Sequence, residues 1–230
     1  MKLLFNLCAF LLHLSSFYVR GEDSFASEDC QAWAESGECD VNPDWMREHC
    51  ELACQEQEEL ARKDMEAISQ IQSFYDLKAK DIDGNEVDFV DLKGKVVVIT
   101  NVASYCGFTA QHYRELVQLY HDVKDTEMLE IMAFPCNQFG QQEPEECPVI
   151  KKFAQQKGVE FRMMDKVDVN GKDAHVVYKY LKNVSGTKTI RWNFATYFLI
   201  DSEGNVQSHS GTTPLELYDP VMKLIDRDEL

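Results

Sequence analysis

The sequence predicts an α/β protein in which helices flank a mixed β-sheet, preceded by a small module stapled by disulfides. From residue 73 onward, apolar β-branched runs alternate with amphipathic segments, which is the pattern of strand–helix units. Four cysteines fall within residues 30–54, a density typical of modules too small to bury an adequate core. Residues 22–66 hold 15 acidic and three basic side chains, whereas the whole chain has a net charge of −17. This acidic front end is a separate module, and the charge disfavours a nucleic-acid partner.

Residues 1–21 are expected to be a signal peptide. Lys2 provides the positive start, an apolar stretch follows over residues 3–14, and small residues flank Arg20 before Glu22. The alternative is a membrane anchor, which is disfavoured because the apolar stretch is too short to span a bilayer. The chain ends in Arg-Asp-Glu-Leu at residues 227–230, which resembles the Lys-Asp-Glu-Leu retention signal.

A leader and a retention tail together predict the endoplasmic reticulum lumen, with the retrieval receptor as a partner. Disulfides persist in that compartment. Asn183-Val184-Ser185 is then a candidate glycosylation site, and an unused sequon is the alternative.

Residues 22–58 form the predicted acidic disulfide module, and residues 59–72 a helical linker. The module has four cysteines, which allow three disulfide pairings: Cys30, Cys39, Cys50 and Cys54. The segment 51–72 contains neither Gly nor Pro and is rich in strong helix formers. The module is either a binding surface for a partner or a passive appendage.

The main domain is predicted over residues 73–226. A hairpin turns at Asp83-Gly84-Asn85, between strands at 74–79 and 87–89. The run 96–100 predicts a central strand. A helix follows at 109–124, with Thr109 as its N-cap, and then a strand at 129–134. Strand, helix and strand in this order make a right-handed parallel crossover.

Later segments complete the domain. The predicted elements are a helix at 148–157 beginning with Pro148, a helix at 172–182, a hairpin of strands at 196–200 and 206–209, and an amphipathic helix at 214–225. The complete order resembles the thioredoxin-like fold.

Cys106 lies between the predicted central strand and the following helix. A helix N-terminus offers unpaired N–H groups and partial positive charge, which favour the thiolate, the reactive form of sulfur. Thioredoxins place a second cysteine three residues later, but here Thr109 stands there. A mechanism that uses a single thiol is therefore favoured over disulfide exchange.

Three segments carry a resemblance to a known family. They are 101–109, Asn-Val-Ala-Ser-Tyr-Cys-Gly-Phe-Thr; 134–144, Phe-Pro-Cys-Asn-Gln-Phe-Gly-Gln-Gln-Glu-Pro; and 192–194, Trp-Asn-Phe. Together they resemble the glutathione peroxidase family over residues 73–225, in its cysteine-type, ER-resident-like branch. The resemblance implies a catalytic group of Cys106, Gln142, Trp192 and Asn193.

The amide and indole groups are donors that can hold a peroxide and stabilise the developing charge. Peroxide oxidises the Cys106 thiolate to a sulfenic acid. Taken alone, Trp192 would be a core residue, Asn193 a cap and Gln142 a loop amide. Their common order with Cys106 is what favours the catalytic interpretation.

The resemblance also bears on how the sulfenic acid is reduced. Gln155 stands where internally resolving relatives carry cysteine. Cys136 is the first candidate for a resolving thiol and Cys147 the second, and Cys136 could instead be an inert buried thiol. Glutathione or a disulfide-isomerase-type protein could reduce Cys106 directly. No bound cofactor or metal is expected. The short connection 178–191 lacks the segment of tetrameric relatives, which implies a monomer with an open active site.

The N-terminal cysteines, with Trp33 and Gly37, resemble the ShK (sea-anemone-toxin-like) module. That family has six cysteines, and Gln57 occupies the place of the last one. The resemblance implies the pairs Cys30–Cys50 and Cys39–Cys54. We therefore expect a thiol peroxidase that reduces hydrogen peroxide or organic hydroperoxides. The alternatives are an adaptor protein that keeps a non-catalytic peroxidase scaffold and, less favoured, a secreted channel-binding toxin.

Overall fold

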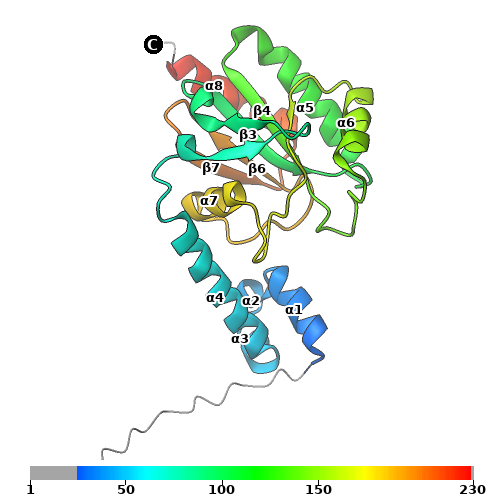
Figure 1. Cartoon of the computed structure of the whole chain (residues 1–230), viewed down its shortest axis with the longest axis vertical. Coiled ribbons are helices and arrows are strands. Elements are labelled where there is room, and N and C mark those ends of the chain that lie inside the picture. Colours follow the sequence, from blue (N-terminus) through cyan, green and yellow to red (C-terminus); the bar gives the residue numbers. More distant parts are fainter. Residues whose placement is uncertain (1–24, 229–230) are drawn as a thin grey trace, which may run out of the picture.

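The computed structural model describes residues 25–228, apart from the side chains of Ala67 and Asp228. The predicted signal peptide and the last two residues of the predicted retention tail lie outside the described residues. Figure 1 shows a small helical module at one end of the molecule and a larger α/β domain, connected through helix α4 (Glu51–Ile68). None of the helices within residues 25–228 combines the length and the apolar character needed to cross a bilayer.

Five strands form the sheet of the larger domain, in the order β5-β4-β3-β6-β7. Their bounds are Val96–Val102 (β3), Leu129–Pro135 (β4), Arg162–Met163 (β5), Thr196–Ile200 (β6) and Val206–Ser210 (β7). Strand β3 is parallel to β4 and antiparallel to β6, so the sheet is mixed, as predicted. All seven residues of β3 are buried because both faces of the sheet are covered.

Alternate residues of β3 point to opposite faces of the sheet. Val96, Val98 and Val102 belong to one cluster, whereas Val97 and Ile99 belong to the other. The first cluster is covered by α5 (Thr109–Val123), α6 (Cys147–Gln156) and α8 (Tyr218–Asp228). The second is covered by α7 (Val176–Ser185) and by the hairpin of β1 (Lys78–Lys80) and β2 (Glu86–Asp88). The predicted layers of helices around a mixed sheet are confirmed.

Short 3₁₀ helices complete this domain at η1 (Phe74–Asp76), η2 (Phe89–Leu92), η3 (Lys124–Thr126) and η4 (Pro214–Leu217). Two of them replace predicted regular structure. The first half of the strand predicted at 74–79 is η1, which a capping box of Ser73 and Asp76 stabilises. The helix predicted from Pro214 starts as η4 before α8 begins.

Two further predictions need correction. The helix predicted at 172–182 begins only at Val176, because His175 caps it by accepting a hydrogen bond from the amide of Val177. Thr109 is not the N-cap of α5 but its first residue, since Phe108 occupies the cap position. The Thr109 hydroxyl instead donates a 2.5 Å hydrogen bond to the carbonyl oxygen of Ala103.

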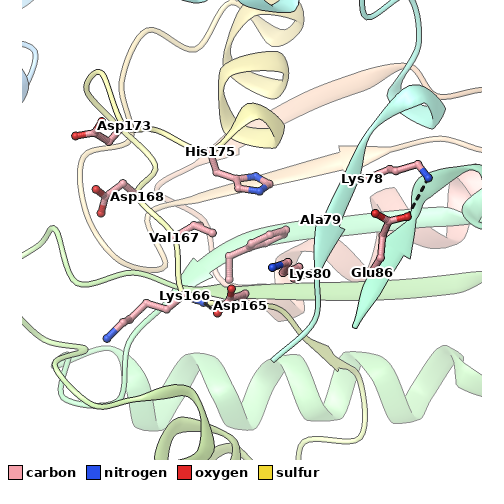
Figure 2. A pocket seen from close by; sticks show the side chains of 11 residues that line it. Lys78, Ala79, Lys80, Glu86, Asp165, Lys166, Val167, Asp168, Asp173 and His175 are labelled. Carbon is pink, nitrogen blue, oxygen red and sulfur yellow. Dashed lines mark hydrogen bonds and ion pairs between the residues drawn. The ribbon is translucent and has the colours of Figure 1, made fainter. Parts of the chain in front are cut away.

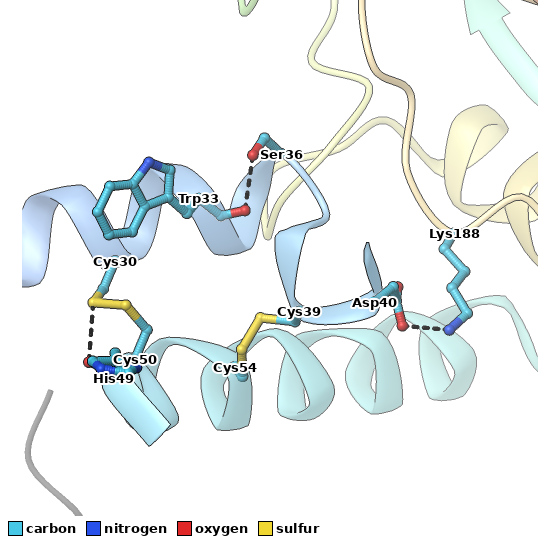
Figure 3. The surroundings of a disulfide bond; sticks show 9 residues. All are labelled: Cys30, Trp33, Ser36, Cys39, Asp40, His49, Cys50, Cys54 and Lys188. Carbon is cyan, nitrogen blue, oxygen red and sulfur yellow. Dashed lines mark hydrogen bonds and ion pairs between the residues drawn. A yellow bond between two sulfur atoms is a disulfide. The ribbon is translucent and has the colours of Figure 1, made fainter. Parts of the chain in front are cut away.

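The N-terminal module consists of α1 (Ser27–Glu35), α2 (Glu38–Val41), α3 (Pro43–His49) and the start of α4. Disulfides join Cys30 to Cys50 and Cys39 to Cys54, which confirms the implied pairing (Figure 3). The buried core is small, with Met46 as its largest fully buried side chain. The two crosslinks therefore supply much of the stability that such a core lacks.

Within the described residues, α4 and the N-terminal module both contact the larger domain. Asp64 of α4 pairs with Lys179 of α7 at 2.9 Å, and both side chains are mostly buried. Asp40 of the module pairs with Lys188, as Figure 3 shows. Gly37 has φ +91°, and a Cβ there would lie 2.7 Å from the methyl group of Thr189. A glycine is thus required by both the backbone conformation and the close approach of the two parts.

Candidate active site

Cys106 follows the end of β3 by a short loop and precedes the N-terminus of α5. Its side chain is only 7% exposed. The amide of Thr109 donates a 3.1 Å hydrogen bond to the Cys106 carbonyl oxygen, so the loop closes directly onto the helix. Tyr105 and Phe108, which lie beside Cys106 in the sequence, have exposed side chains, and so does Trp192. The Cys106 thiol is thus buried, whereas the aromatic side chains of Tyr105 and Phe108, close to it in the sequence, are exposed to solvent.

The loop that carries Gln142 is bound to the Cys106 loop at two points. The amide of Tyr105 donates a 3.0 Å hydrogen bond to the Gln142 carbonyl oxygen. The hydroxyl of Ser104 donates to Oε2 of Glu143 at 3.1 Å. These bonds place Gln142 against the residue that directly precedes Cys106.

Trp192 reaches the same place from the segment before β6. Gly140 and Gln141 both adopt left-handed backbone conformations, which turn the Gln142 loop sharply. A Cβ at Gly140 would lie 3.6 Å from both Gln142 Cγ and Trp192 Cη2. Gly140 thus marks the position where the amide and the indole converge. The ring of Phe139 supports the indole, with 5.8 Å between centroids.

A relay of side-chain amides orients Gln142. Nδ2 of Asn101, at the end of β3, donates to Oδ1 of Asn193 at 3.0 Å. Nδ2 of Asn193 then donates to Oε1 of Gln142 at 3.4 Å. Because the side-chain oxygen of Gln142 accepts this bond, its Nε2 group remains available to donate to another partner. The structure thus brings Gln142, Trp192 and Asn193 to the Cys106 loop from distant parts of the sequence.

Three residues of this group, Asn101, Ser104 and Glu143, were not assigned a role from the sequence. Asn101 offered a signal, because it is a polar residue at the end of an otherwise apolar strand. Glu143 is fully buried and its amide donates to Oδ1 of Asn137 at 2.9 Å. Burial raises the pKa of its carboxyl group to about 7, although the hydrogen bond from Ser104 opposes the shift.

Cys136 lies one residue beyond β4, and its amide donates to the carbonyl oxygen of Val102 at 2.9 Å. Its side chain is fully buried in the cluster on the second face of the sheet, whereas Cys106 belongs to the cluster on the first face. Burial raises the pKa of the Cys136 thiol to about 12. The two thiols therefore belong to the cores on opposite faces of the sheet.

Cys147 begins α6 on the same face of the sheet as Cys106. Its thiol donates a 3.1 Å hydrogen bond to a carboxylate oxygen of Asp165. Burial, and then this carboxylate, raise the pKa of the Cys147 thiol, which favours the protonated form. Cys147, like Cys106 and Cys136, takes part in no disulfide within the described residues.

Asn183, the candidate glycan acceptor, lies in the last turns of α7 with an exposed side chain. This placement leaves the sequon accessible from solvent. Glycosylation of Asn183 stays a prediction.

A separate cavity of about 500 Å³ opens near α7, between the β1–β2 hairpin and the loop that precedes the helix. Figure 2 shows the ring of His175 pointing toward the hairpin, while Lys78 pairs with Glu86 on the opposite side. Asp168 and Asp173 also line the cavity. Burial lowers the pKa of His175. Neither Cys106 nor Gln142 lines this cavity, so it is distinct from the candidate active site. Within residues 25–228 we find no group of three or more His, Cys, Asp or Glu residues arranged to hold a metal.

Comparisons with known proteins identify the family to which this chain is similar. A family model described as glutathione peroxidase matches residues 74–182, and one described as ShK domain-like matches residues 23–56. The chain is 48% identical to "Glutathione peroxidase-like peroxiredoxin 2" of Saccharomyces cerevisiae, over 67% of this chain and 98% of the yeast protein. It is 47% identical to "Probable phospholipid hydroperoxide glutathione peroxidase 6, mitochondrial" of Arabidopsis thaliana, over 70% of this chain and 71% of the plant protein.

The fold is also found in a solved relative. The crystal structure of Trgpx in its apo form matches with a TM-score of 0.57 and 36% identity, covering 68% of this chain and 97% of that one. The chain therefore belongs to the glutathione peroxidase family, as a thiol-dependent peroxidase that carries an ShK-like module at its N-terminal side.

Proposed function

We propose that Cys106 is the peroxidatic residue, acting on hydrogen peroxide or organic hydroperoxides. The observation that carries this proposal is the amide relay that ends on Gln142 beside the Cys106 loop. The thiolate sulfur attacks one peroxide oxygen, the O–O bond breaks, and the other oxygen leaves with the electron pair. The products are a sulfenic acid on Cys106 and an alkoxide or hydroxide, which takes up a proton.

The surrounding donors have different tasks in this step. Gln142 and Trp192 are partly exposed and offer N–H groups to the peroxide oxygens and the developing charge. Asn193 is fully buried, and both ends of its amide are engaged by Asn101 and Gln142. It is therefore a positioning residue that acts through Gln142.

The sulfenic acid is reduced by an external thiol. The first thiol displaces water and forms a mixed disulfide with Cys106, and a second thiolate then releases Cys106 and carries away the oxidised pair. Glutathione supplies two such thiols, and a disulfide-isomerase-type protein supplies them from one Cys-x-x-Cys pair. Direct reduction by an external thiol is favoured over resolution by Cys136, because Cys136 belongs to the core on the opposite face of the sheet.

The exposed aromatic side chains of Tyr105 and Phe108 indicate which kinds of substrate and reductant could bind next to them. Tyr105 and Phe108 are 60% and 52% exposed. Such side chains pack against an apolar hydroperoxide tail or against a protein surface. The name of the Arabidopsis relative, which includes phospholipid hydroperoxide, supports an organic hydroperoxide as substrate.

The proposed place of action is the lumen of the endoplasmic reticulum. The leader at residues 1–21 and the tail at residues 227–230 support this proposal, which also implies binding to the retrieval receptor. The family membership of the chain does not favour a purely adaptor role.

The proposal is tested by peroxide consumption with the disulfide-bonded protein. Cys106→Ser is compared with the matched variant Cys147→Ser, each with glutathione and with a reduced disulfide isomerase. We expect Cys106→Ser to lose at least about 100-fold in kcat/KM, whereas Cys147→Ser keeps the parent rate. Equal activity of Cys106→Ser and the parent refutes the assignment.

A further inference from the structure

Four aromatic rings gather on the surface of the N-terminal module. The ring of Phe25, just before α1, lies 5.7 Å from that of Trp33 on α1 and 5.4 Å from that of Trp45 on α3, measured between centroids. The rings of Trp33 and Trp45 are 5.5 Å apart, and His49 stacks on Trp45 at 4.6 Å. We call these four side chains the aromatic patch. Its members come from both ends of the module's helical segment, so the fold of the module brings them together.

Two members of the patch are more exposed than packing within the module requires. Phe25 is 44% exposed and Trp45 is 41% exposed. Trp33 is partly buried and packs against the core of the module, whereas Phe25 and Trp45 lie outside that core. Exposed clusters of aromatic side chains are typical of binding surfaces, and Trp is enriched among the residues that dominate them. Two of the three Trp residues of the chain lie in this patch.

The patch faces away from the larger domain. Figure 1 shows α3 and the start of α1 at the end of the molecule that is remote from the sheet. Figure 3 shows Trp33 beside the Cys30–Cys50 disulfide, whereas Lys188 of the larger domain meets the other end of the module in that view. A groove of about 710 Å³ separates the module from α7, and neither Trp33 nor Trp45 lines it. The patch is therefore open to a partner as far as residues 25–228 are concerned.

The helices that carry the patch are strongly acidic. Residues 25–50 contain seven Asp and Glu residues but only one Lys or Arg, which is Arg47, and Arg47 lines the groove instead. Asp29 precedes Trp33 by four residues on α1, and Glu48 follows Trp45 by three residues on α3. Residues at these spacings are neighbours on a helix surface. Both carboxylates are exposed, so negative charge lies beside the aromatic rings.

This combination of charge and aromatic surface selects among the possible occupants. A second copy of the chain would bring the same negative charge to the interface, and anionic lipid headgroups would also be repelled. A cationic partner is attracted by the carboxylates, and the faces of aromatic rings bind Lys and Arg side chains through cation–π contacts. Burial of the apolar ring surface requires apolar side chains on the same partner. A polypeptide that carries both kinds of side chain matches the patch.

We propose that the aromatic patch docks a basic, amphipathic segment of another polypeptide. Lys or Arg side chains of this segment lie against the exposed rings and beside Asp29 and Glu48. Its apolar side chains cover Phe25 and Trp45. The disulfide module thus has a binding role that is separate from the peroxide chemistry of the larger domain.

Calorimetric titration of the disulfide-bonded protein with synthetic peptides tests the patch directly. The probe is a peptide of about 14 residues, made of Lys and Leu, in which the Leu residues form one face of a helix. One comparison peptide has Glu in place of Lys, and another has Ala in place of Leu. We expect saturable binding of the Lys/Leu peptide with a Kd on the order of 10 μM. The Ala-containing peptide should bind at least about 10-fold more weakly, and the Glu-containing peptide should not bind.

Substitutions in the patch locate the bound peptide. Trp45→Ala removes an exposed ring outside the core of the module and should weaken binding by about 10-fold or more. Phe25→Ala should weaken it by about fivefold or more, and it leaves the helices intact because Phe25 precedes α1. The control is Tyr218→Ala, at an exposed aromatic residue of α8, which should bind like the parent.

A matched pair of double variants tests the contribution of local charge. Asp29→Asn with Glu48→Gln removes two carboxylates beside the rings, whereas Asp122→Asn with Glu146→Gln removes two exposed carboxylates of the larger domain. The two proteins have the same net charge. We expect about fivefold weaker binding of the Lys/Leu peptide in the first protein and a change within about twofold in the second.

Three outcomes overturn the proposal. One is absence of binding of the Lys/Leu peptide to the parent. Another is equal affinity in Phe25→Ala and the parent, which would place the peptide elsewhere on the acidic surface; this result counts even where Trp45→Ala loosens the module. The third comes from sedimentation of the protein alone, because a parent dimer that Trp45→Ala abolishes would assign the patch to a second copy of the chain.

Discussion

The hydroxyl of Ser104 donates a 3.1 Å hydrogen bond to Oε2 of Glu143, whose carboxyl group is completely buried. This contact joins the loop before Cys106 to the loop that carries Gln142. The other carboxyl oxygen of Glu143 has no partner within residues 25–228. A buried acid with one free oxygen favours its protonated form, and the pKa of Glu143 is accordingly raised to about 7.

Glu143 should make stability depend on pH. The unfolded chain releases this proton near pH 4.5, whereas the folded protein holds it up to about pH 7. The folded state thus binds more protons between these values, and its stability decreases as pH rises. We expect Glu143 to contribute a loss of about 3 kcal/mol in the free energy of unfolding over this range.

Denaturant unfolding from pH 4.5 to 8 measures this contribution as the difference between the parent and Glu143→Gln. The neutral side chain should remove the decrease. Glu146→Gln, at an exposed position in the same loop, should leave it unchanged. An identical pH dependence in Glu143→Gln and the parent would show that Glu143 is ionised throughout.

Gly140 holds the Gln142 loop in a left-handed turn, with φ +62°. Gly171 has φ +77° but open space around its Cα. Alanine at either position should cost about 1–2 kcal/mol in stability, since the backbone strain is the same in kind. Gly140→Ala should also lower kcat/KM by about 10-fold, because the strained turn displaces Gln142 and Trp192. Gly171→Ala should keep the parent kcat/KM, and a similar loss in both variants would contradict this explanation.

The two disulfides should stabilise the N-terminal module but not the larger domain. Cys39 and Cys54 are 15 residues apart, and a loop of this length is worth about 3 kcal/mol in a chain-entropy treatment. We expect replacement of Cys39 and Cys54 by serine to increase the rate of amide hydrogen exchange in α1–α3. The amides of β3 and β4 should keep their protection, because they belong to a separate core. Equal loss of protection in β3 would indicate one cooperative unit instead.

Cys136 and Cys147 differ in position but should both be dispensable with glutathione as reductant. Cys136→Ala leaves only a small gap in a core, and Cys147→Ala removes the thiol that donates to Asp165. We expect turnover within about threefold of the parent for both. A loss above 10-fold in Cys136→Ala, in a protein that still unfolds cooperatively, would show that Cys136 reaches Cys106 during the cycle.

The fold was largely predictable because its core elements are long and strongly patterned. The apolar run at 96–100 and the spacing of Tyr113, Leu116 and Tyr120 are direct signals of a buried strand and a helix packed on it. The corrections concern ends and short elements. Strand β5 has two residues, too few for a pattern. The start of α7 depends on capping by His175, a local hydrogen bond that periodicity does not reveal.

The family resemblance pointed to the candidate site residues in their motifs but not to the residues that support them. Gln142, Trp192 and Asn193 stand in recognisable motifs. Asn101 and Glu143 act through hydrogen bonds that connect residues 92 and 39 positions apart. The position of Cys136 on the second face follows from the alternation of β4, but only once the register and end of that strand are known.

The central claim is that Cys106 is the sulfur that peroxide oxidises. Its most direct test exposes the reduced protein briefly to less than one equivalent of hydrogen peroxide, in the presence of a sulfenic-acid trap. Mass spectrometry of peptides then locates the trapped group. We predict that it is found on Cys106, with Cys136 and Cys147 unmodified. Trapping on Cys147 or Cys136, with Cys106 still a free thiol, would contradict the claim.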